Sequence, residues 1–528
     1  MRLSPTRLLV AIAAVGLLAP SCSSDDPGVA SGPPMVAAKA STVFELPEGS
    51  AFEPGPCPIN PTLNTPVAIQ CGMVRVLEKR DQPDSGNVDL QVMILRSTSE
   101  NPQPDPIVYL EGGPGGSAIV NLQSWIDPVT PLLDERDVIL VDQRGTGFST
   151  PSLACDEEFS DATLFDTSAS VLGECIARLD AAGVDRSAYT TFENAADLKD
   201  IRTSLGLESW NLYGVSYGTR LAMASMAVDP DGIRSVVLDS TYPLTVDLYD
   251  TLPSNGLRSF QAVFGACAAD AECNGAYPDL ENRFYDTIDR LNAEPAVVKG
   301  IHPMNGTNLS YLFDGNALVD ILYQALYLPE VIPDVPEAID AAANGNAQAI
   351  WDLLVAPVFP DPDEVAKYQE DALDIGRETF PSSITDGMHL SVQCTEEVPF
   401  TEIGEVEADA EPLPPQVSVA LIGSVVSMKT QCDIWGVPPR DIAELDPLVN
   451  STIPTLILAG SFDPITPPEW GRIAADRLEN VTYIEIAGIG HAVIGGGECA
   501  GQLIGSFIDD PEAFDPNMCT IEAPDFVD

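Results

Sequence analysis

The chain has 528 residues, of which 45% are hydrophobic and 20% are charged, a composition typical of a folded protein with room for more than one domain. Its 80 acidic and 25 basic residues give a formal net charge of -55 at pH 7. Such an acidic surface repels polyanions. We therefore expect neither a nucleic-acid partner nor electrostatic binding to anionic membranes.

The N-terminus has the features of a bacterial export signal. Two arginines precede a short apolar run over 8–19, and Cys22 follows small residues as in a lipobox. We expect a signal peptide over 1–21, lipid attachment at Cys22 and a flexible linker over 22–50. These features predict a lipoprotein of the bacterial cell envelope, periplasmic or at the cell surface, that contacts the membrane only through its anchor. A plainly secreted protein is the alternative.

The cysteines predict disulfides. Apart from Cys22, ten of the 11 cysteines remain, and an even number in an exported chain favours pairing. Spacing alone does not fix the connectivity. We expect sequential pairs because each then closes a modest loop: Cys57–Cys71, Cys155–Cys175, Cys267–Cys273, Cys394–Cys432 and Cys499–Cys519. Since the chain has only three histidines and no C-x-x-C pair, we expect no metal ion and no other cofactor.

Short apolar runs alternate with helix-like segments, which predicts an α/β fold with a mostly parallel central sheet and helices on both faces. An antiparallel pair is expected first, and buried strands follow; the runs lie at 73–77, 88–95, 107–110, 138–141, 210–213, 235–238, 454–459 and 481–486. The strand pattern is interrupted after Tyr242. We therefore expect a core over 51–242 and 451–528, with a largely helical cap over 243–450 inserted between two strands at the carboxyl edge of the sheet.

The segment 214–218 reads Gly-Val-Ser-Tyr-Gly, a G-x-S-x-G pattern between a strand-like run and a helix-like run. This is the context of a nucleophile elbow, in which the serine occupies a strained turn. Side chains at Gly214 or Gly218 would crowd the neighbouring strand and helix. The pattern predicts Ser216 as a nucleophile.

A serine hydroxyl needs a histidine that takes its proton. Of the three histidines, His302 and His389 fall in the expected cap, whereas His491 directly follows the last predicted strand. The loop after that strand reaches the sheet edge that carries the elbow. We therefore predict His491 as the general base.

The histidine in turn needs a carboxylate that holds it. Along the chain, the acid is expected between the serine and the histidine, after the preceding strand. Asp463 occupies that place, and the interval to His491 leaves room for one helix and one strand. We predict Asp463 as the acid, with Glu485 and Glu498 as alternatives.

An oxyanion hole requires two backbone N–H groups aimed at the developing negative charge. One is expected from Tyr217, directly after the nucleophile. The second is expected from the glycine-rich loop 111–117, because glycine lets the backbone approach the reacting atoms closely. We choose the N–H of Gly113. The loop is not a phosphate-binding loop, since no Gly-Lys-Ser/Thr follows it.

Three motifs occur in a characteristic order: Glu-Gly-Gly-Pro-Gly-Gly-Ser at 111–117, Asp-Gln-Arg-Gly-Thr-Gly-Phe-Ser at 142–149 and Gly-Val-Ser-Tyr-Gly-Thr at 214–219. Together they resemble the prolyl and tripeptidyl aminopeptidase branch of the α/β-hydrolase superfamily. The resemblance covers roughly residues 70–525 and includes a C-terminal segment like that of secreted tripeptidyl aminopeptidases. It implies the α/β-hydrolase fold and serine hydrolysis that releases single residues or short peptides from the N-termini of peptide substrates. Ser216, Asp463 and His491 match the family's triad.

One position departs from the family pattern. Prolyl aminopeptidases usually begin the glycine loop with His, but this chain has Glu111. Strict proline specificity is therefore not expected. An aminopeptidase must also hold a positively charged N-terminus, and Glu111, Glu396 and Glu397 are candidates for that contact. Asp142 and Arg144 are expected to form a structural pair that braces the loop beside the elbow.

Two other functions stay open at this point. A carboxylesterase could use the same triad, since fold and triad do not fix the acyl substrate. A surface-binding lipoprotein with an inactive hydrolase fold is the second alternative, although the intact serine, acid, histidine and glycine loop argue against it. Nothing in the sequence indicates an oligomeric state.

Overall fold

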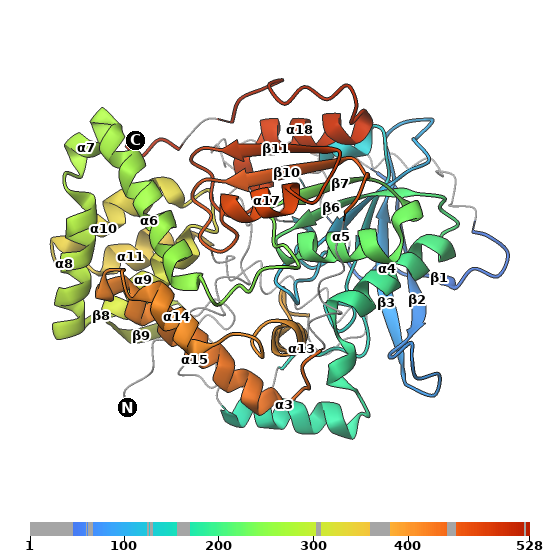
Figure 1. Cartoon of the computed structure of the whole chain (residues 1–528), viewed down its shortest axis with the longest axis horizontal. Coiled ribbons are helices and arrows are strands. Elements are labelled where there is room, and N and C mark those ends of the chain that lie inside the picture. Colours follow the sequence, from blue (N-terminus) through green and yellow to red (C-terminus); the bar gives the residue numbers. More distant parts are fainter. Residues whose placement is uncertain are drawn as a thin grey trace, which may run out of the picture.

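A nine-stranded sheet forms the centre of the molecule in the computed structural model (Figure 1). The structure describes residues 46–59, 61, 67–123, 126, 130–155, 169–301, 308–358, 381–440, 450–521 and 524–527. The predicted signal peptide (1–21), the predicted lipidation site Cys22 and linker residues 23–45 lie outside the described residues. Within the part of the chain so described, no helix combines the length and apolar character needed to cross a bilayer.

The strand order is β1-β2-β3-β5-β4-β6-β7-β10-β11. The first three pairings from the β1 edge, including β3 with β5, are antiparallel, and all later ones are parallel. The strands are β1 (Phe52–Gly55), β2 (Ile69–Leu77), β3 (Asn87–Leu95), β4 (Ile107–Leu110), β5 (Val138–Val141), β6 (Trp210–Val215), β7 (Ile233–Asp239), β10 (Thr455–Gly460) and β11 (Val481–Ile486). The mostly parallel sheet predicted from the short apolar runs is confirmed; β4 and β5 are buried along their whole length because both of their faces are covered.

Helices cover both faces of the sheet (Figure 1). On one face, side chains of α4 and α5 pack with the sheet in one apolar core, and on the other, α18 packs in a second. The helices of this part are α3 (Ala169–Ala181), α4 (Thr191–Ser204), α5 (Tyr217–Val228), α17 (Pro468–Ala475) and α18 (Glu498–Asp509). Helix α4 begins with a T-x-x-E sequence, and its cap residue Thr190 accepts the backbone N–H of Glu193 at 3.3 Å.

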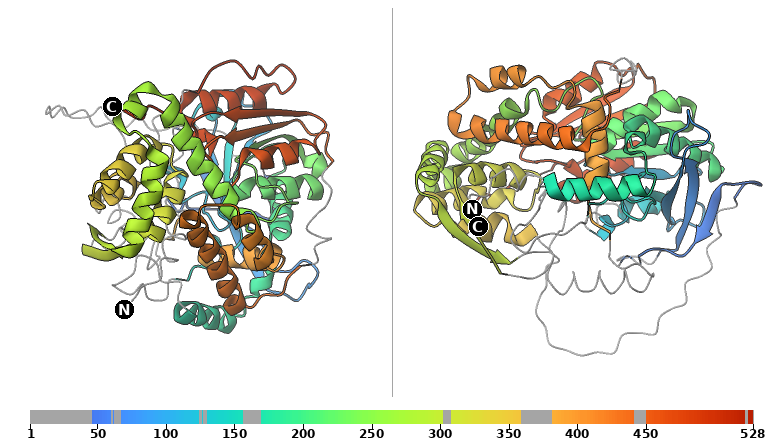
Figure 2. Two further views of the ribbon diagram at one scale, coloured as in Figure 1. Left: turned by 60° about the vertical axis from the view of Figure 1, so that its left-hand side comes forward. Right: turned by 90° about the horizontal axis from the view of Figure 1, so that it is seen from below.

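The chain between β7 and β10 forms a separate apolar core of mostly helical elements, which Figure 1 shows to one side of the sheet and beneath it. The elements between β7 and β10 are α6 (Leu252–Ala269), α7 (Ala271–Ala276), α8 (Leu280–Ala293), β8 (Ala296–Ile301), β9 (Asn308–Phe313), α9 (Gly315–Ala325), α10 (Val335–Ala343), α11 (Gln348–Leu354), α13 (Asp386–Glu396), α14 (Ile403–Ala410) and α15 (Pro415–Trp435). Of these, α13 packs instead in the core that α4 and α5 form with the sheet. The antiparallel hairpin β8–β9 was not expected. Figure 2 shows the long helix α15 lying beside α3, so this insertion also contacts the first part of the core.

The five disulfides join the cysteines in sequential pairs, as predicted. Cys394–Cys432 links α13 to α15 within the insertion. Disulfides in this number are typical of proteins outside the reducing cytoplasm.

Candidate active site

Ser216 stands on a sharp turn between β6 and α5. Its backbone has φ 56° and ψ -124°, a conformation that L-residues rarely adopt. Such backbone strain costs on the order of 1–3 kcal/mol and persists only where the surroundings enforce it. The side chain is partly exposed, whereas both neighbours in the chain are buried. The turn therefore presents one hydroxyl at the carboxyl edge of the sheet.

The two flanking glycines are required by close backbone contacts. A Cβ atom at Gly214 would lie 2.4 Å from the carbonyl oxygen of Gly218, and one at Gly218 would lie 2.0 Å from that of Leu110. Neither contact is possible for a larger residue without moving the backbone. The crowding predicted from the motif is confirmed.

Asp463 and His491 meet at the same edge of the sheet. Asp463 follows β10 and His491 follows the neighbouring strand β11, and Asp463 Oδ2 lies 2.9 Å from His491 Nδ1. Both residues are buried, with exposures of 0% and 6%. Asp463, rather than Glu485 or Glu498, is therefore the carboxylate that contacts the imidazole.

Thr466 is a third member of this contact that the sequence did not reveal. Its hydroxyl lies 2.7 Å from Asp463 Oδ2 and 3.1 Å from His491 Nδ1, and its backbone N–H donates to Asp463 Oδ1 at 2.8 Å. Burial by itself raises the pKa of Asp463, but His491 and the Thr466 donors outweigh it and hold that pKa below its usual range. The acid is thus kept ionised beside the imidazole. Thr466 lies three residues after Asp463, and this spacing is the one feature of the sequence that could have suggested it.

The nucleophile lies two strands away from the acid, since β7 separates β6 from β10. Among the residues that the structure describes, no hydrogen bond joins the Ser216 hydroxyl to His491. Contacts of this kind are commonly loose in free enzymes and tighten around the reacting substrate. The topology brings all three predicted residues to one edge of one sheet.

The glycine-rich loop after β4 touches the elbow directly. A Cβ atom at Gly112 would lie 2.9 Å from Ser216 Cβ, and Gly113 has φ 114°, which favours glycine. Among the described residues, the turns, loops and helix ends offer no backbone acceptor to the N–H groups of Gly113 and Tyr217. Both are therefore free to donate to an oxyanion beside Ser216.

A family model described as alpha/beta hydrolase fold matches residues 105–497. The chain belongs to the alpha/beta hydrolase family. Serine protease Hip1 of Mycobacterium tuberculosis is 23% identical to this hydrolase over 494 residues, which cover 87% of this chain and 89% of that protein. A probable proline iminopeptidase of Streptomyces coelicolor is 31% identical over 281 residues, or 53% of this chain and 62% of that protein. These relatives support a serine hydrolase. A solved structure of the proline iminopeptidase of Mycobacterium smegmatis aligns with 80% of this chain and 95% of its own at 15% identity and a TM-score of 0.37.

The brace of the glycine loop in this hydrolase differs from the expected one. Asp142 accepts the Ser117 hydroxyl at 2.6 Å and so holds the end of the loop. Arg144 does not pair with Asp142; it forms a two-pronged contact with Asp197 at 2.7 and 2.8 Å. The two residues are only two positions apart, but Arg144 turns toward α4 because Asp197 offers a planar carboxylate there.

The other two histidines belong to the insertion between β7 and β10. His302 lies outside the described residues. His389 lies on α13, and its Nδ1 is 3.2 Å from the carbonyl oxygen of Pro114 in the glycine loop. Burial lowers the pKa of His389 to about 4, so this ring is neutral at physiological pH.

The insertion contacts the histidine loop as well. The carbonyl oxygen of Leu326, at the end of α9, accepts the backbone N–H of His491 at 3.1 Å. The Tyr327 ring lies against the imidazole, with centroids 4.7 Å apart and planes tilted by 52°. The insertion thus forms part of the wall around the predicted base.

The acidic candidates Glu396 and Glu397 are buried, with exposures of 2% and 3%. Both oxygens of Glu396 accept hydrogen bonds from Thr191, from its N–H at 2.7 Å and its hydroxyl at 2.6 Å. Glu397 lies 2.5 Å from the guanidinium of Arg220, which is one helical turn after Ser216. Both carboxyl groups therefore already have partners within the protein.

Glu111, the third candidate, is partly exposed and begins the glycine loop. Its Oε1 accepts the backbone N–H of Gly112 at 3.1 Å. Burial of the carboxyl group raises the pKa of Glu111 to about 7, against the opposing effect of that hydrogen bond. Glu111 is thus the acidic candidate nearest along the chain to the predicted oxyanion donor.

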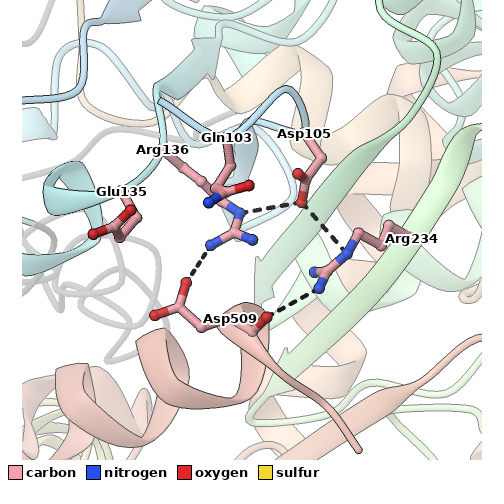
Figure 3. Close-up of a pocket in the computed structure, with 6 residues that line it drawn as sticks. All are labelled: Gln103, Asp105, Glu135, Arg136, Arg234 and Asp509. Carbon is pink, nitrogen blue, oxygen red and sulfur yellow. Dashed lines mark hydrogen bonds and ion pairs between the residues drawn. The ribbon is translucent and has the colours of Figure 1, made fainter. Parts of the chain in front are cut away.

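A polar pocket of about 350 Å³ lies away from the elbow, at the amino ends of the parallel strands (Figure 3). Its arginines are paired: Arg136 contacts Asp105 at 3.1 Å and Asp509, and Arg234 contacts Asp105 at 3.5 Å. These pairs join α18 to the strand ends. They leave no uncompensated cation to attract a ligand, so we assign the pocket a structural role.

Proposed function

We propose that this hydrolase is an exported serine aminopeptidase that releases single residues or short peptides from the N-termini of peptide substrates. The observation that carries the proposal is the buried hydrogen bond between Asp463 and His491, at the sheet edge that also carries the strained Ser216 turn. The relatives named above include a serine protease and a probable proline iminopeptidase. The disulfides support a place outside the cytoplasm, and lipid anchoring at Cys22 remains part of the proposal.

In the proposed mechanism, Ser216 Oγ attacks the scissile carbonyl carbon and His491 Nε2 takes its proton. Asp463 holds the Nδ1–H of the imidazole and stabilises the imidazolium that forms. The N–H groups of Gly113 and Tyr217 donate to the oxyanion. The intermediate collapses, the amine leaves with the proton from His491, and an acyl-enzyme remains on Ser216. Water, deprotonated by His491, then releases the N-terminal fragment and restores the serine.

The substrate's N-terminal ammonium is proposed to bind an acidic side chain near the elbow. Of the three candidates, Glu111 is partly exposed as a residue, and its buried Oε2 has no hydrogen-bond partner among the described residues, whereas Glu396 and Glu397 are buried against Thr191 and Arg220. A buried carboxylate that already has partners gains little from a further cation. We therefore place Glu111 first, with Glu396 and Glu397 as the alternatives.

Labelling with a fluorophosphonate probe tests the proposal. The wild-type protein should react, and Ser216→Ala should not. Peptide p-nitroanilides with free and acetylated N-termini, compared with p-nitrophenyl esters, then identify the substrate class. Preference for the free amine supports the aminopeptidase. Turnover of esters alone would favour the carboxylesterase, and no labelling would favour an inactive hydrolase fold.

A further inference from the structure

Strained backbone is concentrated at one place in this fold. Among the residues that the structure describes, four non-glycine residues have positive φ: Ser216 at 56°, Ser240 at 59°, Ala492 at 67° and Asp279 at 58°. The first three follow β6, β7 and β11, and the fourth caps a helix in the insertion. Strain of this kind persists only where surrounding contacts enforce it. The contacts that enforce it here converge on the end of β7.

Asp239, the last residue of β7, bonds to both sides of the site. Its backbone carbonyl accepts the N–H of Ser216 at 2.9 Å. Its carboxylate accepts the N–H groups of Val493 at 2.7 Å and Ile494 at 3.0 Å, just after His491. One residue therefore holds the nucleophile through its backbone and the histidine loop through its side chain.

The neighbouring residues complete the same attachment. The Ser240 hydroxyl accepts the N–H of Ala492 at 2.9 Å, and the Tyr213 hydroxyl donates to Asp239 Oδ2 at 3.1 Å. Three consecutive N–H groups that follow His491 are thus bound to Asp239, which ends β7, and to Ser240, which follows it. A loop held by three hydrogen bonds has little freedom to move the imidazole relative to the elbow.

Asp239 itself is fully buried, with 0% exposure, so it does not reach a substrate. Burial raises its pKa to about 6, and the two backbone N–H donors oppose that rise. An ionisable group kept dry in this way costs stability, and replacing it by an apolar group is often neutral or favourable when only stability matters. The hydrogen bonds of Asp239 instead connect the Ser216 turn to the loop that follows His491.

From these contacts we infer that Asp239 is a positioning residue, which sets the separation between the Ser216 hydroxyl and the His491 imidazole. The inference rests on the proposed serine mechanism. A displacement of about 1 Å in such a pair can slow the chemical step by about 100-fold. Substrate binding does not depend on that separation. Loss of the hydrogen bonds that Asp239, Ser240 and Tyr213 make here, which we call the clamp, should therefore lower kcat and leave KM nearly unchanged.

The test compares Asp239→Asn with a matched control, Asp105→Asn. Asp105 is also a buried aspartate beside the same sheet, but it bonds to Arg136 and Asn211 at the opposite edge, within the pocket of Figure 3. We expect Asp239→Asn to lower kcat on the preferred substrate by about 10- to 100-fold with KM within about 2-fold. Asp105→Asn should lower the melting temperature and leave kcat unchanged.

Two milder variants keep the test decisive if Asp239→Asn fails to fold. Ser240→Ala and Tyr213→Phe each remove one hydrogen bond of the clamp, and we expect kcat to fall by about 3- to 10-fold in each. Wild-type kcat in Asp239→Asn, or in both milder variants, would overturn the inference. A wild-type protein that neither labels with fluorophosphonate nor hydrolyses any substrate would instead overturn the proposed function, so the two failures are distinguishable.

Discussion

The Arg220 guanidinium lies 2.5 Å from the Glu397 carboxylate, and both side chains are buried. Arg220 is on α5, which begins at the elbow, and Glu397 directly follows α13 of the insertion. Arg220 also donates to the carbonyl oxygen of Pro243, where the chain leaves the core. One cation thus joins the elbow helix, the start of the insertion and α13.

This ion pair predicts a specific pH dependence of stability. Burial raises the pKa of Glu397 to about 7, although Arg220 opposes the rise. An unfolded glutamate releases its proton near pH 4.3, so between about pH 4.3 and 7 the folded state binds more protons than the unfolded state. The free energy of unfolding should therefore fall as pH rises through this window, by up to about 4 kcal/mol from this group.

Glu397→Gln should remove that contribution, because an amide stays neutral at every pH. We expect the difference between unfolding free energies at pH 5 and pH 8, measured by urea denaturation, to be smaller in this variant than in the wild type. Glu407→Gln, at an exposed position of α14, is the control and should leave the difference unchanged. An equal pH dependence in wild type and Glu397→Gln would show that Glu397 is not the titrating group.

Glu111 should govern the pH dependence of amine binding. Its pKa of about 7 means that the carboxylate forms as pH rises from about 6 to 8. If it binds the substrate ammonium, the KM of a free-amine peptide should fall over pH 6 to 7.5. Glu111→Gln should raise that KM by about 10-fold and flatten the profile, since a charge-assisted contact contributes about 1.5–3 kcal/mol.

The control for Glu111 is the same peptide with an acetylated N-terminus, on which Glu111→Gln should have little effect. Glu396→Gln provides the comparison within the protein, because its carboxylate is bonded to Thr191. An increase in KM confined to free-amine substrates in Glu396→Gln, with none in Glu111→Gln, would transfer the role to Glu396. Equal changes on both substrates would count against an amine contact for either residue.

The sequence was sufficient for eight of the nine strands of the sheet and for the chain order of the site, but the edge strand β1 was not predicted. Runs such as Val138–Val141 are apolar throughout, which is typical of a strand covered on both faces. The pattern of glycines around Ser216 reflects a local steric need, so it is visible without a structure. His491 could be chosen because the chain has so few histidines, and Asp463 because of its place after β10.

The supporting residues could not be predicted because their partners are distant in sequence. The role of Asp239 depends on the N–H groups of Val493 and Ile494, about 250 positions away, and no local pattern marks it. The hairpin β8–β9 was missed for a similar reason. Its Gly300 lies against the Trp351 ring so closely that a Cβ atom would be 2.1 Å from it, and this tertiary contact has no signature in the surrounding helical sequence.

Thr466 should contribute to the chemical step rather than to binding. Its hydroxyl donates to Asp463 Oδ2, which also contacts the imidazole. Thr466→Val removes that donor at nearly constant volume, and Thr466→Ser retains it. We expect Thr466→Val to lower kcat by about 10-fold with KM unchanged, as for the loss of one hydrogen bond to a charged group. A wild-type kcat in Thr466→Ser would show that the hydroxyl, and not the packing of the side chain, is responsible. Equal kcat values in the wild type and both variants would show that the hydroxyl does not contribute to the chemical step.

Tyr327 should keep the His491 ring in its working orientation from the side of the insertion. The two rings are 4.7 Å apart, and the adjacent carbonyl of Leu326 binds the His491 backbone. An aromatic pair of this kind contributes about 0.5–1.5 kcal/mol, so its loss should slow the reaction by up to about 10-fold. Tyr327→Ala should show this fall in kcat on a small p-nitrophenyl ester, and Tyr327→Phe should retain the wild-type rate.

The matched control is Tyr311→Ala, which removes an aromatic ring of the same insertion that packs against Trp351 at 5.7 Å. Both alanine variants should lower the melting temperature, because each leaves a cavity in the insertion. Only Tyr327→Ala should lower kcat. If the two variants lose activity in proportion to their loss of stability, Tyr327 merely packs the insertion. If Tyr327→Phe is as slow as Tyr327→Ala, the hydroxyl and not the ring acts on His491.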